Sequence, residues 1–91
     1  MDGVSVPGEV LAVPERVIVA PAVGVFRPLA DSEGHDAAER VIAPGQAIGV
    51  VEGPGASTPV RSPFGGFLVA MLARAGERVR EGQPIAWLRL T

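Results

Sequence analysis

Lysine and cysteine are both missing from this 91-residue chain, and all eight of its cationic side chains are arginines. Without cysteine the chain has no disulfides and no thiolate metal ligands, so an apolar core must hold the fold together. Without lysine it has no side-chain amine that a ligase could join to a carboxylic acid, because arginine stays protonated. Amide attachment of a prosthetic group to a side chain is therefore excluded.

Aromatic residues and clusters of like charge are also scarce. The net charge is −2, the arginines are spread along the chain, and the only aromatic residues are Phe26, Phe64, Phe67 and Trp87. A nucleic-acid surface combines a basic stripe with stacking aromatic side chains, so we expect no nucleic-acid partner. No apolar run is long enough to span a membrane, and Met1–Ser5 shows no signal peptide. We therefore expect a cytoplasmic protein with no membrane association.

Short apolar runs lie between the many residues that break secondary structure. The chain has 12 glycines and 9 prolines, which disfavour long helices. The runs are rich in β-branched and other apolar residues and predict strands at 17–20, 24–26, 47–52, 60–62, 67–72 and 85–90. Residues 36–40 and 70–74 offer short helical alternatives. We predict an all-β domain over residues 17–91, preceded by an extended arm at 1–16 with an added edge strand at 9–13.

Three sequence elements occur twice in the same order. Residues 20–26 match residues 62–68, residues 39–41 match 77–79, and residues 45–48 match 82–85. Such a repeat predicts two halves related by a pseudo-two-fold axis, each unable to bury its apolar face alone. Together the halves can form a flattened β-barrel or sandwich of about eight short strands.

The order Pro-x-x-Gly, Gly-Gln, hairpin, Pro-x-x-Gly, Gly-Gln resembles the biotinyl/lipoyl attachment domain family. The closest likeness is to the biotin carboxyl carrier protein of acetyl-CoA carboxylase, and it covers residues 17–90. The opening at residues 20–26 is similar to that family's Ser-Pro-Met-Val-Gly-Thr-Phe. The resemblance implies a barrel-sandwich hybrid, with Pro28–Ala38 at the place of the protruding loop called the thumb.

The departure from this family lies at the hairpin that joins the two halves. The family pattern Glu-Ala-Met-Lys-Met aligns without a gap, so that Glu52 matches the glutamate and Gly55 matches the modified lysine. Pro54 and Ala56 replace the methionines that flank this lysine and that the ligase reads. We therefore expect no biotin, lipoate or other cofactor. Proline followed by glycine predicts a tight turn at 53–56, and docking of this tip on a partner is the alternative.

The only histidine, His35, stands in a polar loop with Asp31, Glu33 and Asp36. A histidine beside carboxylates can serve as a general base or a metal ligand. With one nitrogen ligand in the loop, we expect no metal site and favour a solvated loop. His35, Glu33, Asp36 and Glu52 are the candidates if the protein is a catalyst.

Other residues have structural explanations. Ser57 lacks the sequence context of a nucleophile and is expected to cap the turn, and Gly65-Gly66 is too short to bind phosphate. We expect scattered surface ion pairs for Arg61, Arg74, Arg78 and Arg80, with an acidic partner or a coenzyme A phosphate as the alternative. The predicted core consists of Val17, Val19, Val23, Val41, Ile48, Val50, Phe67, Val69, Met71, Val79, Ile85 and Trp87.

Three functions are compatible with these features. The first is a binding or assembly module that has kept the carrier fold without the swinging arm, for example with an acyl-CoA carboxylase-like or biosynthetic complex as its protein partner. The second is a small biosynthetic enzyme, such as a cyclase or other acid/base catalyst, or a small-molecule binder, using a crevice between the thumb-like loop and the hairpin. The third is a homo-oligomeric structural module.

Overall fold

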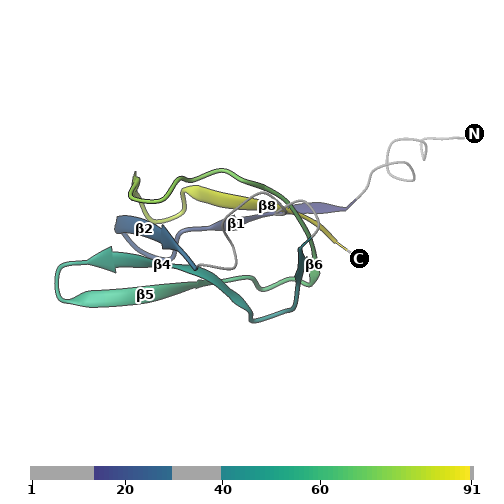
Figure 1. Ribbon diagram of the computed structural model, residues 1–91, viewed down its shortest axis with the longest axis horizontal. Coiled ribbons are helices and arrows are strands. Elements are labelled where there is room, and N and C mark those ends of the chain that lie inside the picture. The colour runs from purple at the N-terminus through teal and green to yellow at the C-terminus, as the bar shows by residue number, and fades with distance from the viewer. Residues whose placement is uncertain (1–13, 30–39, 91) are drawn as a thin grey trace, which may run out of the picture.

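The computed structural model describes residues 14–29 and 40–90, which form two four-stranded antiparallel sheets packed as a sandwich (Figure 1). This confirms the all-β prediction, and no helix occurs in the described ranges. The predicted strand 9–13 and most of the thumb-like loop lie outside them. The strands are β1 (Glu15–Val19), β2 (Gly24–Pro28), β3 (Val41–Ile42), β4 (Ala47–Gly53), β5 (Ala56–Arg61), β6 (Gly66–Met71), β7 (Arg78–Val79) and β8 (Pro84–Leu90).

The strand order confirms that the molecule consists of two equivalent halves. One sheet has the order β1-β8-β6-β3 and the other β5-β4-β2-β7. Replacing each strand by the one four places away in the chain converts one order into the other. The halves therefore exchange strands, so that each sheet contains two strands from each half and neither half can form its sheet alone.

The repeated Pro-x-x-Gly element marks a close crossing of the backbone. A Cβ atom on Gly24 would overlap the carbonyl oxygen of Glu52, and one on Gly66 would overlap the carbonyl oxygen of Arg89. These two pairs of residues are equivalent under the pseudo-two-fold axis. Glycine is needed at both positions because any side chain would push the neighbouring strand away.

The repeated Gly-Gln element closes a turn before the last strand of each half. The Gln46 side-chain oxygen accepts a hydrogen bond from the Ala43 N–H at 2.9 Å, and Gln83 accepts one from the Arg80 N–H at 3.0 Å. The isoleucine two residues later, Ile48 or Ile85, falls at a shift in register and is fully buried.

The middle element of the repeat is aligned one residue differently from the sequence prediction. Val41 pairs with Phe67 on β6, and Arg78 pairs with Val25 on β2, so Val41 and Arg78 are the equivalent residues. The sequence match had paired Val41 with Val79. The dipeptide Arg-Val occurs at 40–41 and again at 78–79, which is why the sequence match aligned them. Ile42 and Val79 are the buried residues of their strands, so these two residues are the structurally equivalent ones.

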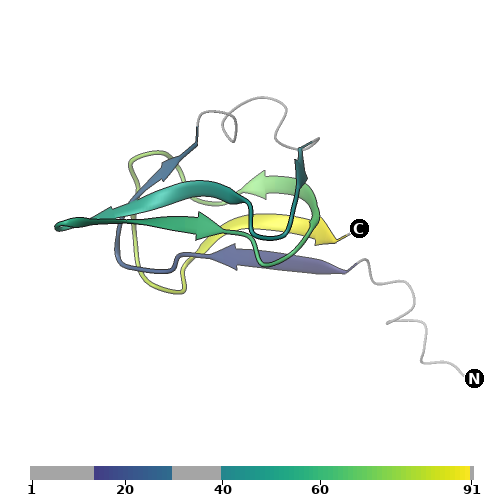
Figure 2. The same ribbon diagram turned by 90° about the horizontal axis from the view of Figure 1, so that it is seen from below.

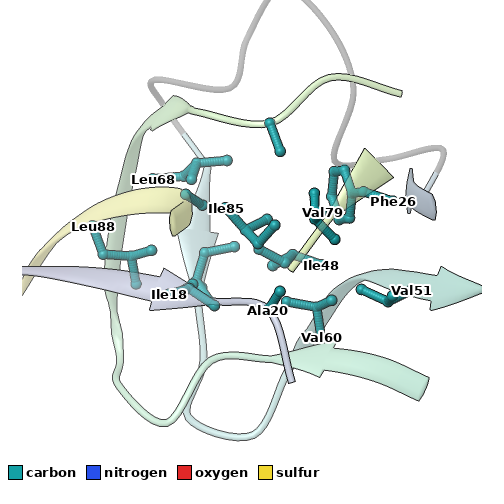
Figure 3. Packing of buried hydrophobic residues seen from close by; sticks show 13 residues of the cluster. Ile18, Ala20, Phe26, Ile48, Val51, Val60, Leu68, Val79, Ile85 and Leu88 are labelled. Carbon is teal, nitrogen blue, oxygen red and sulfur yellow. The ribbon is translucent and has the colours of Figure 1, made fainter. Parts of the chain in front are cut away.

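The core lies between the two sheets and draws on both halves (Figure 3). Of the twelve predicted core residues, Ile48, Val79 and Ile85 are buried. The other nine are exposed or half-buried, which corrects the prediction. Most of the buried residues are sequence neighbours of predicted ones; the core is Ile18, Ala20, Phe26, Ile42, Ile48, Val51, Val60, Leu68, Ala73, Val79, Ile85, Ala86 and Leu88.

The physical reason for this error is that several strands carry apolar residues on both faces. In β1, Ile18 is buried, whereas Val17 and Val19 point to the opposite face of the sheet. A run that is apolar at every position does not reveal which alternate set faces the core. The same ambiguity affects Trp87, which pairs with Val17 and is half-buried outside the core.

Candidate functional site

The hairpin formed by β4 and β5 projects from one end of the molecule (Figures 1 and 2). At the opposite end, β1 begins and β8 ends side by side, and the Leu90 N–H donates to the Pro14 carbonyl oxygen at 2.9 Å. The hairpin is therefore the part of the described fold farthest from the ends of the β1–β8 pair. It is also the segment that the family resemblance aligns with the attachment hairpin.

The tip of this hairpin is a two-residue turn. Gly53 pairs with Ala56, and Pro54 and Gly55 connect them. Gly55 has a φ of 74°, and the described non-glycine residues, Pro54 included, have negative φ. A proline followed by a glycine of positive φ is typical of a type II turn, so the predicted tight turn is confirmed.

Gly55 is open to solvent but restricted by its backbone. A Cβ atom added there would have no neighbour within 4 Å. Its positive φ nevertheless disfavours any residue with a side chain. The tip thus has space for a side chain and a conformation that selects against one. Pro54 and Ala56 are also exposed, so the tip presents backbone and small side chains to a partner.

Glu52 lies on the outer face of the β5-β4-β2-β7 sheet, next to the tip. Its Oε1 atom accepts a hydrogen bond from Nε of Arg27 at 2.7 Å, on the neighbouring strand β2. The side chains of Glu52 and Arg27 are 44% and 56% exposed. This exposed ion pair gives Glu52 a structural role on the surface of the sheet, and its geometry does not single it out as a catalytic group.

The remaining catalytic candidates, His35, Glu33 and Asp36, lie outside the described residues, as does Asp31. Their convergence with Glu52 therefore stays a prediction. Within residues 14–29 and 40–90, no three His, Cys, Asp or Glu side chains come together to hold a metal ion.

Two serines near the hairpin differ in their roles. Ser57 is an exposed strand residue opposite Glu52, so the predicted role in the turn itself is wrong. Ser62 is fully buried, and its hydroxyl donates to the Phe64 carbonyl oxygen at 2.6 Å and accepts from the Phe64 N–H at 3.1 Å. It closes the bend before β6. The sequence signal for this role was the serine that precedes the second Pro-x-x-Gly element.

The four arginines of interest do not form one cluster. Arg61 and Arg78 point outward from the β5-β4-β2-β7 sheet, and Arg61 donates to the Gly45 carbonyl oxygen at 2.9 Å. Arg74 lies in the β6–β7 loop, where it lines a shallow depression together with Glu77. Arg80 follows β7 and is exposed. These four arginines therefore do not converge on a common binding site for an anion.

No protein-family model matches this sequence, and no curated protein matches it. The described residues contain no helix that is long and apolar enough to cross a membrane.

Proposed function

We propose that this protein is a biotin carboxyl carrier protein-like domain that cannot be modified and acts as a binding or assembly module. Its partner is a protein complex of the acyl-CoA carboxylase type or a related biosynthetic complex, and its place of action is the cytoplasm. In this role the domain occupies the docking place of a carrier without delivering a prosthetic group.

The observation that carries this proposal is the hairpin tip. It projects from one end of a pseudo-symmetric two-sheet fold, as an attachment hairpin must to reach a distant active site. Its exposed residue Gly55 has no side chain, and the chain has no lysine. A shape that is suited to docking, combined with the loss of the reactive amine, supports binding without group transfer. This argument from fold to function is one of analogy.

The alternative, a small biosynthetic enzyme or small-molecule binder, has weaker support. Of its four candidate residues, Glu52 is exposed and paired with Arg27. The other three lie outside the described residues. We therefore keep this alternative as an outcome of the test below.

Co-purification tests the proposal directly. The tagged full-length chain is mixed with carboxylase, carboxyltransferase and biosynthetic subunits from the same organism, and retained subunits are identified. We expect at least one such subunit to be retained by the wild-type protein. The double variant Pro54→Arg/Ala56→Arg should lose it, because two bulky charges at the tip interfere with docking.

The matched control is Glu81→Arg, which changes the net charge by the same amount on a different exposed turn. It should retain the subunit as the wild type does. If the wild-type chain retains none of these subunits, the assembly role is wrong. If the chain instead turns over or binds a small molecule, and His35→Ala abolishes this, the enzymatic alternative replaces it.

A further inference from the structure

The two outer faces of the sandwich are built from equivalent positions but differ in how many charged residues they carry. On the β5-β4-β2-β7 sheet, four of the outward residues are charged, and we call this side the polar face; its outward residues are Val25, Arg27, Val50, Glu52, Ser57, Pro59, Arg61 and Arg78. On the β1-β8-β6-β3 sheet, the outward residues other than Glu15 and Arg89 are apolar, and we call this side the apolar face; its large apolar residues are Val17, Val19, Val41, Phe67 and Trp87.

The difference is sharpest where arginines are exchanged for valines. The pseudo-two-fold axis relates Arg61 to Val19 and Arg78 to Val41. Val19 is 46% exposed and Val41 is 63% exposed. The fold itself therefore accepts charged residues at both positions, so burial inside the domain does not explain the valines. Several exposed apolar side chains on one face of a sheet mark an interaction surface.

We infer that the apolar face is the interface of a two-fold symmetric homodimer, in which two copies of this chain pack face to face. This inference goes beyond the proposed assembly role and does not depend on it. Two sheets packed in this way lie about 10 Å apart, and their outward side chains interdigitate. Trp87 and Phe67, the two aromatic residues of the face, then become the main contacts.

The charges support a second copy as the occupant. The outward charged residues on the described strands of this sheet are Glu15 and Arg89, which pair with each other at 3.5 Å at one end of the face. One acid and one base give no net charge, so the face can lie against its own copy without like-charge repulsion. The polar face carries three arginines, Arg27, Arg61 and Arg78, against one glutamate, so two copies of it would repel.

The size of the face indicates a weak dimer. Four strands span about 15 Å, and the longest of them, the seven-residue strand β8, extends about 23 Å. A face with these dimensions has a smaller area than a typical stable interface, so we expect a dissociation constant in the micromolar range or weaker. Closed two-fold dimers are the commonest form of homo-oligomer, and they need only one self-complementary patch.

Sedimentation equilibrium of the full-length chain is the first test. Between about 10 μM and about 1 mM, the range suited to a small interface, the apparent mass should rise from the monomer value of 9.4 kDa towards twice that value. The double variant Val19→Arg/Val41→Arg copies the residues of the equivalent positions on the polar face. It should weaken association at least tenfold, because unpaired charges would be buried in the dimer.

The matched control is Ser57→Arg, which adds an arginine to the polar face and should associate as the wild type does. The single variant Val41→Arg provides a milder change if the double variant does not fold. A second measurement needs no substitution. Trp87 is the only tryptophan and the chain has no tyrosine, so intrinsic fluorescence reports on the apolar face. Its emission should shift to shorter wavelength as the concentration rises.

A wild-type chain that stays monomeric throughout this range, with constant Trp87 emission, would overturn the inference. So would a folded arginine variant, double or single, that associates as strongly as the wild type. A rise in mass with loss of association in the arginine variants and its retention in Ser57→Arg would support it.

Discussion

Gly55 and Glu52 are the two residues of the hairpin that the family resemblance singles out. Gly55 stands at the tip with a positive φ and open space where a Cβ atom would lie. Glu52 stands three residues earlier and pairs with Arg27 on the outside of the sheet. Both have a structural role that needs no catalysis, because one shapes the turn and the other forms an exposed ion pair.

Replacing Gly55 by alanine should lower the free energy of unfolding by about 1 kcal/mol, because a side chain strains the left-handed backbone. Gly55→Asn should lose less, since asparagine tolerates this conformation better than alanine does. Chemical denaturation of the three proteins measures the difference. If the alanine variant is as stable as the wild type, the turn does not have the conformation described here.

Replacing Glu52 by glutamine should change the free energy of unfolding by less than about 1 kcal/mol, because the ion pair with Arg27 is exposed to solvent. Arg27→Gln should have an effect of similar size. The double variant should then be little worse than either single variant. A loss of several kcal/mol in the same denaturation experiment would show that Glu52 has a buried role that its exposure does not indicate.

The Gly-Gln turns are two of the connections that join the two sheets. In each half a glutamine side chain holds the backbone of the turn, and the following isoleucine enters the core. The backbone hydrogen bonds are also equivalent: the Gly45 N–H donates to the Ser62 carbonyl oxygen at 2.6 Å, and the Gly82 N–H donates to that of Ala20 at 2.8 Å. The turns therefore tie each half to the first strand of the other half.

We predict that Gln46→Ala and Gln83→Ala each lower the free energy of unfolding by about 1 kcal/mol, because each removes a side-chain hydrogen bond to a turn N–H. The Gln83 variant should lose more, since Gln83 also donates from Nε2 to Glu77 Oε2 at 3.1 Å. Thermal unfolding of both variants tests this order. Equal stability of the wild type and both variants would mean that the backbone alone sets the turns.

The elements also show what could be predicted from the sequence and why. Strand content, the two-residue turn at the hairpin tip and the pseudo-symmetry could be predicted, because Gly and Pro have strong local preferences and the repeat preserves order. The inward side of several strands could not be predicted, because Val17 and Ile18 are equally apolar. The pairing of Glu52 with Arg27 could not be predicted either, since it joins residues 25 positions apart.

At the scale of the whole molecule, symmetry separates what the fold requires from what it does not. Both halves need a glycine at the backbone crossing, Gly24 or Gly66, and an isoleucine at the shift in register, Ile48 or Ile85. The halves differ on their outer faces and at their ends. One end carries the exposed hairpin tip. The equivalent position at the other end is occupied by the start of β1 and the end of β8.

We propose that this hairpin stands at the place of a carrier's attachment hairpin and has lost the chemistry of that hairpin. Co-expression with a biotin ligase, followed by intact-mass measurement, tests both parts of this claim. The wild-type chain should show its unmodified mass, because it has no lysine. The triple variant Pro54→Met/Gly55→Lys/Ala56→Met restores the family's Met-Lys-Met sequence at the tip and should gain one biotinyl group. Biotin on the wild-type chain, or a folded triple variant that stays unmodified, would contradict the claim.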